Sequence, residues 1–334
     1  MENEEGQKRR LSLCLALLLA ATLGINLLSA YIRHQEAGLG CKPWPACYAR
    51  IGAVMEPPGD SPVAALTPTE SAKRAHRGLA TGLVILVLLV VYYARQQNLP
   101  AAARPLPYTM VAVLLLLAVI GPASYLKTLP AIATANLAGG MALLGLTWTF
   151  LLLTRNSSQP AAAASGDRTR LPPASLKKTA LLILSAQILL GAWLSANFAA
   201  AACSGFLNCD ATEGAGLLQS FWYLRELTVA PSGAVLTGGQ QSLIALTHHW
   251  GAVVTVLALS ALGLISLRAG GTYAFWGGWL MALVVLQASL GGIALFLSLP
   301  LLLVLGHDLL AALLLLVLLR LFLLPSGEKS RPAS

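Results

Sequence analysis

The sequence predicts an all-α integral membrane protein, with eight transmembrane helices arranged as two four-helix bundles related by a pseudo-twofold axis. Composition gives the first indication, because 57% of the 334 residues are hydrophobic and only 10% are charged. A soluble domain carries roughly 25% charged residues, so little room remains here for a separate soluble domain. Long apolar runs and an internal repeat give the second and third indications.

The apolar runs are long enough for helices that cross a bilayer, which takes about 20 residues. Eight runs qualify as candidate spans: 11–32, 76–94, 108–126, 130–153, 177–197, 242–267, 273–297 and 300–323. Basic residues precede the first run, and no small-residue cleavage site follows it. We therefore expect a retained helix there, not a cleaved signal peptide.

The internal repeat appears when four spans are compared with the next four. Each half has a Cys-x5-Cys loop after its first span, Cys41 with Cys47 and Cys203 with Cys209. Each second span starts at a histidine, and each fourth span follows a Leu-Pro pair. Four matched features in one order indicate a duplicated unit. An even number of spans per unit predicts a pseudo-twofold axis along the membrane normal.

The repeat divides the chain into three parts. We predict an N-terminal four-helix bundle over residues 1–155 and a C-terminal four-helix bundle over residues 177–334. Residues 156–176 are rich in Ser, Ala and Pro, a composition typical of a flexible linker.

The distribution of Lys and Arg predicts that both termini and the linker are cytoplasmic. Basic residues collect in the loops on that side, whereas the long outer loop 198–241 carries only Arg225. The outer loop 33–75 is an exception, because it is basic as well. The net charge of +9 therefore belongs to loops, and without a nucleic-acid motif we expect no nucleic-acid partner.

Two of the five histidines stand at similar depth in the second half. His248 lies a few residues into its span, and His307 lies seven residues after Pro300. Two imidazoles at one depth can ligate a haem iron from both faces, and ionisable residues inside spans are usually functional. The alternatives are lone interfacial side chains, or a zinc site that would lack a third ligand. We expect His249 to face elsewhere and assign His34 no role.

The cysteine pairs face the oxidising side of the membrane, where disulfides persist. Each pair is a disulfide candidate, with a structural and a redox role both open. Cys14 lies inside the first span and is expected to be a buried apolar residue.

The start of the second span carries three further candidates. Glu70 is six residues before His76 and either caps the helix or handles protons near whatever His76 binds. Arg77 could pair with a haem propionate.

Taken together, the loop AGLGCKPWPAC, the His-Arg pair, the later histidine and the final Pro–His helix resemble the haem A synthase family, also called the COX15/CtaA family. The resemblance implies oxidation of the methyl group at ring position 8 of haem O to a formyl, which gives haem A for cytochrome oxidase. It implies haem b between His248 and His307, and substrate haem O on His76. It also implies a bacterial inner-membrane protein that works with a haem O synthase and with cytochrome oxidase or its assembly factors. The electron donor and a homo-oligomeric state are left open.

Two residues depart from the family pattern. Asn136 stands where the family places a second histidine, and Lys73 stands where it often has a glutamate. The substrate haem could therefore be held by His76 alone, with Asn136 beside it. The alternative function is a relative that binds haem b for electron transfer, or assists oxidase assembly, without making haem A. A transporter is disfavoured, because broken helices with midplane polar sites are missing from the sequence.

Overall fold

The computed structural model describes residues 2–36, 67–121, 128–156, 171–203, 205–206, 208–209, 215–228, 235–236 and 238–326. These residues fold into helices, and among them the one β-type pairing is an isolated bridge between Cys203 and Cys209. The long helices are α1 (Glu2–Glu36), α3 (Pro68–Arg95), α4 (Leu106–Ile120), α5 (Pro130–Asn156), α6 (Ala174–Ala196), α8 (Gly239–Ala269), α9 (Gly271–Phe296) and α10 (Leu301–Leu323). Two short helices, η3 (Ala199–Ala202) and α7 (Leu217–Ser220), lie between α6 and α8. The predicted all-α class is confirmed.

Within the described residues, 7 helices are long and apolar enough to cross a membrane. The exception is α4, which has 15 residues, or about 22 Å at a rise of 1.5 Å per residue. The hydrocarbon core is about 30 Å thick, so α4 alone does not span it. The predicted span 108–126 continues into residues 122–127, which lie outside the described part of the chain. In the part of the chain that the structure describes, seven helices therefore meet the length requirement, and the eighth expected span is not confirmed.

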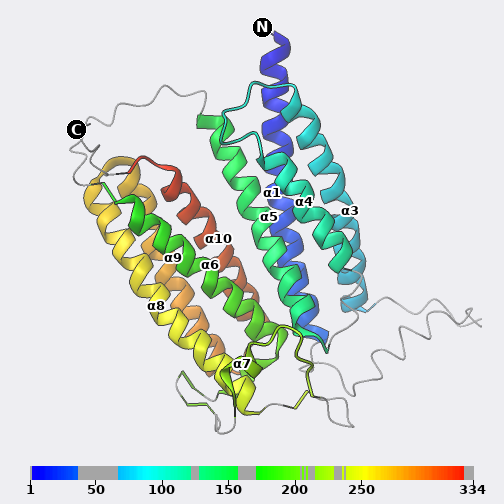
Figure 1. Ribbon diagram of the computed structural model, residues 1–334, viewed down its shortest axis with the longest axis vertical. Coiled ribbons are helices and arrows are strands. Elements are labelled where there is room, and N and C mark those ends of the chain that lie inside the picture. The colour runs from blue at the N-terminus through cyan, green and yellow to red at the C-terminus, as the bar shows by residue number, and fades with distance from the viewer. Residues whose placement is uncertain are drawn as a thin grey trace, which may run out of the picture.

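The helices pack as two groups of four (Figure 1). In the first group, α1 and α4 each pack against α3 and α5. In the second group, α6 and α9 each pack against α8 and α10. It follows that α3 lies at the opposite corner from α5, and α8 at the opposite corner from α10. The groups meet where α1 and α5 pack against α10 and where α5 packs against α6.

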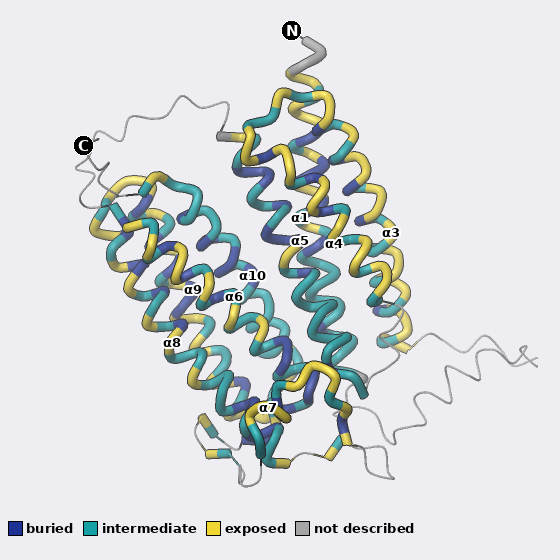
Figure 2. The backbone as a smooth tube through the Cα atoms, viewed as in Figure 1, coloured by how far each residue is buried: buried dark blue, intermediate teal, exposed yellow. Residues whose placement is uncertain are grey.

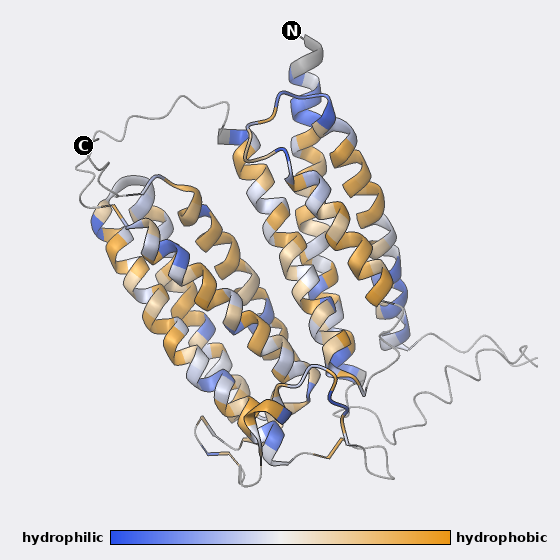
Figure 3. Cartoon of the chain, in the orientation of Figure 1, coloured by the Kyte–Doolittle hydropathy of each residue, from blue (hydrophilic) through white to orange (hydrophobic). Residues whose placement is uncertain are grey.

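Each group has its own apolar core, which Figure 2 shows as dark segments on the inward faces of the helices. The first core includes Leu15, Val87 and Phe150, all fully buried. Many large apolar side chains on the outward faces are exposed, such as Leu182 at 72%. Figure 3 shows apolar residues along most of each long helix. This distribution suits helices that face lipid, because apolar side chains can contact the hydrocarbon directly. The helical backbone also satisfies its own hydrogen bonds where there is no water.

Polar contacts join the two groups at several levels. The indole N–H of Trp148 in α5 donates to the carbonyl oxygen of Leu316 in α10, over 2.8 Å. At the other end, His34 Nε2 lies 3.0 Å from the carbonyl oxygen of Leu299, just before α10. His34, to which we assigned no role from the sequence, therefore links α1 to the loop between α9 and α10.

Candidate functional site

The centre of the second group is built on His248 and His307, which come from opposite corners. His248 lies in the first third of α8, and His307 is the seventh residue of α10. Because α8 and α10 are separated by one antiparallel helix, they run in the same direction and place both histidines near their beginnings. Both imidazoles are half-buried, and they lie near enough for the charge of His307 to act on His248. The structure therefore brings together the two residues that the sequence paired.

Each imidazole has a glutamine beside it from one of the two intervening helices. Gln187 Nε2 of α6 lies 3.1 Å from His248 Nδ1. Gln287 Nε2 of α9 lies 3.0 Å from His307 Nε2. The second ring nitrogen of His307, Nδ1, is buried without a hydrogen-bond partner. A buried imidazole with an unpartnered nitrogen fits a residue that ligates a metal, because such ligands use one nitrogen for the metal and the other for a hydrogen bond.

The first group places His76 and Asn136 at opposite corners as well, on α3 and α5. Both side chains are half-buried. Counted from the Leu-Pro prolines, Asn136 is six residues after Pro130, whereas His307 is seven after Pro300. The residue at the matching count is Leu137, so the repeat places Asn136 one position away from the histidine counterpart.

Glu70 and Arg77 lie on exposed parts of α3. Glu70 forms a capping box with Thr67: its backbone N–H donates to Thr67 Oγ1 over 3.2 Å, and its Oε2 accepts from the Thr67 N–H over 3.0 Å. The capping role is thus observed. The carboxylate lies near Lys73 and Arg74, and the described contacts do not join it to His76.

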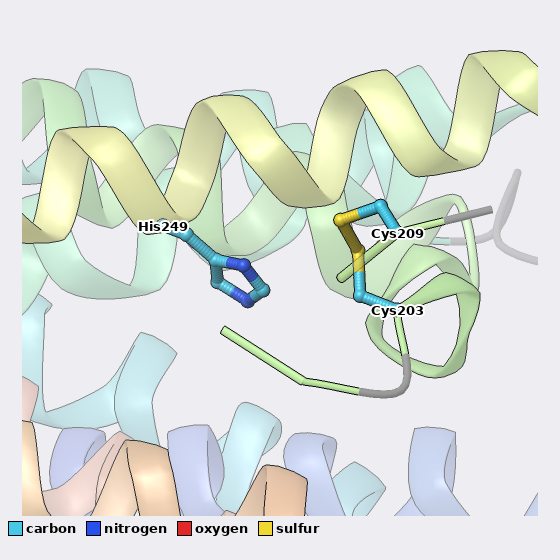
Figure 4. A group of neighbouring side chains, drawn as sticks. All are labelled: Cys203, Cys209 and His249. Atoms are coloured by element: carbon cyan, nitrogen blue, oxygen red, sulfur yellow. A yellow bond between two sulfur atoms is a disulfide. The ribbon is translucent and has the colours of Figure 1, made fainter. Parts of the chain in front are cut away.

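A second polar cluster lies beside the first part of α8 (Figure 4). Cys203 and Cys209 form a disulfide, and the ligand atoms of both cysteines and of His249 lie within 4.8 Å of one another. His249 also stacks on Phe206, with ring centroids 5.2 Å apart. Because both sulfurs are in the disulfide, the cluster offers no thiolate to a metal. The rings of His248 and His249 have centroids 6.4 Å apart and an interplanar angle of 59°, and Cys14 is, as expected, a buried free thiol.

The other predicted disulfide, Cys41 with Cys47, lies outside the described residues. The outer loop also holds Arg225, which donates from Nη2 to Gln240 Oε1 over 2.6 Å. Burial lowers the pKa of Arg225. This contact joins the loop to the beginning of α8, because Gln240 is the second residue of that helix and lies eight residues before His248.

Sequence reasoning missed four polar residues inside the spans. They are Arg33 on α1, Gln187 on α6, Gln287 on α9 and Asp308 on α10. Arg33 has a buried Nε without a hydrogen-bond partner, and its charge acts on His76 and on Asp308. Polar residues are costly inside a membrane, so their positions in apolar runs were the signal that could have found them.

Comparison with known proteins identifies the family of the chain. A sequence model of the COX15-CtaA family, described as cytochrome oxidase assembly protein, matches residues 70–319. The chain is also 30% identical to the heme A synthase of Shewanella oneidensis over 319 residues, which cover 92% of this chain and 94% of that protein. The resemblance to the haem A synthase family is confirmed, and the chain belongs to the COX15-CtaA family of cytochrome oxidase assembly proteins.

Proposed function

We propose that this protein is a haem A synthase that oxidises the methyl group at ring position 8 of haem O to a formyl. One observation carries the proposal: His248 and His307 approach each other from opposite corners of one helix group, and His307 Nδ1 is buried without a partner. Paired histidines within a helix bundle suit axial ligation of a haem. The family membership supplies the reaction class.

The two groups have separate tasks in this proposal. We assign the second group, within residues 177–334, to haem b, held by His248 and His307. Bound there, haem b would supply one-electron redox chemistry. The first group, within residues 1–155, would bind haem O through His76, with Asn136 on the facing helix and Arg77 available to a propionate. Glu70 would move protons in addition to capping α3.

The wider arrangement is also part of the proposal. The eight long helices form two four-helix bundles related by a pseudo-twofold axis. Residues 156–176 form the cytoplasmic linker. Both termini lie in the cytoplasm of a bacterium, and the protein sits in its inner membrane. A haem O synthase would deliver the substrate, and cytochrome oxidase or its assembly factors would receive the product.

A second function is a relative that binds haem b for electron transfer, or assists oxidase assembly, without making haem A. The missing second imidazole in the first group favours it, because Asn136 is a poor haem ligand. This function needs only the second group to hold haem.

The deciding experiment expresses the full chain with a haem O synthase and identifies the extracted haems by chromatography and mass. Haem A is expected with the wild-type chain, absent with His76→Ala and retained with Arg74→Ala, an exposed neighbour on α3. Haem b without haem A in the wild type would favour the second function. Absence of both haems would overturn the assignment to haem chemistry.

A further inference from the structure

Two segments of the second group share the spacing Gln-x-x-x-Gly. They are Gln187 to Gly191 on α6 and Gln287 to Gly291 on α9. Residues four apart lie on one face of a helix. Each segment therefore presents a glutamine amide next to the space left by the missing side chain of the glycine. Because α6 and α9 are the two corners between the histidine helices, the segments face the site from opposite sides.

Each glutamine contacts one imidazole. Gln287 Nε2 lies 3.0 Å from His307 Nε2. Gln187 Nε2 lies 3.1 Å from His248 Nδ1 and also donates to the backbone carbonyl oxygen of His248, over 3.0 Å. The other amide atom, Oε1, is buried without a partner in both residues. An unpartnered buried acceptor beside an imidazole is suited to an N–H that the ring can present.

Each glycine makes room for the same imidazole. A Cβ at position 191 would lie 3.2 Å from His248 Cε1. A Cβ at position 291 would lie 2.9 Å from His307 Cε1 and 3.3 Å from its Nδ1. Any larger residue would push the ring, because carbon atoms pack at about 3.5–4.0 Å. The neighbouring Gly292 differs, since a Cβ there would meet nothing within 4 Å.

The first group lacks this combination. Leu117 and Gln287 both stand thirteen residues before the Leu-Pro proline of their half, and Gly121 and Gly291 both stand nine before it. The leucine side chain packs against Gly139 of α5. The glutamine is thus present in the half that holds both His248 and His307, and a leucine replaces it in the half that holds His76.

We propose that each Gln-x-x-x-Gly segment positions one haem-ligating histidine. The glutamine amide holds the imidazole by a hydrogen bond, and the glycine, which has no side chain, leaves space for the ring. The proposal rests on the haem site proposed above. A flip of its side-chain amide lets Gln287 place Oε1 where Nε2 now lies, so that Oε1 accepts a hydrogen bond from the imidazole N–H. The other ring nitrogen of His307 is then unprotonated and could bind iron. Gln187 keeps its N–H towards the carbonyl oxygen of His248 and fixes the ring relative to the backbone of α8. These glutamines and glycines are positioning residues, because they act through the histidines.

The role of the glycine is tested on the purified full-length chain with its haem, by optical and electron paramagnetic resonance spectra. Gly291→Ala is expected to lose most of the low-spin signal of the wild type, whereas Gly292→Ala keeps it. Comparable thermal unfolding of the two variants shows that the loss is local. Equal low-spin signals in both variants would overturn the proposed role of the glycine.

The amide is tested at Gln287 by two replacements, with the reduction potential of the haem as the readout. Gln287→Glu keeps an acceptor and strengthens it, so the low-spin signal should persist and the potential should fall. Gln287→Leu removes the acceptor and is expected to weaken the signal and raise the potential. If both variants keep the wild-type potential and spectrum, the inference fails while the haem site stands. A wild-type chain without low-spin haem would instead overturn the proposed function and this inference with it.

Discussion

His249 stacks on Phe206 with ring centroids 5.2 Å apart, and this contact holds the outer loop against α8. The loop is closed by the disulfide between Cys203 and Cys209. The ring of His248, the preceding residue of α8, lies beside Gln187 instead. Two adjacent histidines thus contact two different parts of the protein, the loop between α6 and α8 and the helix α6.

The disulfide is expected to stabilise the outer loop without being needed for haem binding. Closing a loop with a sequence separation of 6 is worth about 2 kcal/mol in the chain-entropy account. The variant Cys203→Ala/Cys209→Ala should therefore lower the thermal midpoint in detergent and retain the low-spin spectrum. Cys14→Ala is the control, since Cys14 is a free thiol. A midpoint equal to that of the control, or a lost spectrum, would refute this expectation.

A buried lysine caps the C-terminal end of α10. Lys177 is 2% exposed, and its Nζ donates to the carbonyl oxygens of Leu324 and Pro325 over 2.6 and 3.3 Å. A hydrogen bond from a charged group is worth about 1.5–3 kcal/mol, so Lys177→Met should lower the thermal midpoint clearly. The adjacent Lys178 is exposed, and Lys178→Met should leave the midpoint unchanged. Equal midpoints in the two variants would show that the cap contributes little.

Asn136 is expected to leave one face of the substrate haem without an imidazole. Asn136→His would supply the second imidazole that the family pattern places opposite His76, so we expect haem A yield to rise and a second low-spin signal to grow. Leu137→His is the comparison, because Leu137 has the same count from its proline as His307. The yield of haem A from co-expressed haem O measures both variants. Unchanged yield in Asn136→His would remove position 136 from the haem site.

Glu70 has an observed capping role and a proposed role in proton transfer. Glu70→Gln keeps a side chain that can complete a capping box but removes the carboxylate. We expect haem A yield to drop while the thermal midpoint stays the same. Thr67→Ala is the matched control, since it breaks the cap and keeps the carboxylate. If Glu70→Gln makes haem A at the wild-type level, only the capping role remains.

Much of the fold was predictable because long apolar runs have few solutions in a bilayer. The starts of α3 and α10 follow from the sequence. The Thr67 side chain caps α3, and the restricted backbone of Pro300 favours a helix start at α10. The incomplete length of α4 was overlooked in the predicted span 108–126, although Gly121 and Pro122 follow its last residue directly and are residues that commonly end a helix.

The sequence predicted which two histidines belong to the candidate site, and their role as haem ligands stays a prediction, whereas the residues around their rings were not foreseen. Histidines are rare enough in this chain for a depth-matched pair to stand out, and the structure brings His248 and His307 together. The partners of their rings depend on how α6 and α9 are rotated about their axes, which residue counting does not fix. Gln187 and Gln287 were therefore overlooked, although both are polar residues inside apolar runs.

The most direct test of the account is the axial ligation of the haem in the second group. Low-spin electron paramagnetic resonance of the purified full-length chain should show a bis-histidine haem. The signal should be lost in His248→Ala and in His307→Ala, and it should persist in His249→Ala, whose ring contacts Phe206 instead. A wild-type chain without this signal, or a His307→Ala variant that keeps it, would contradict the account.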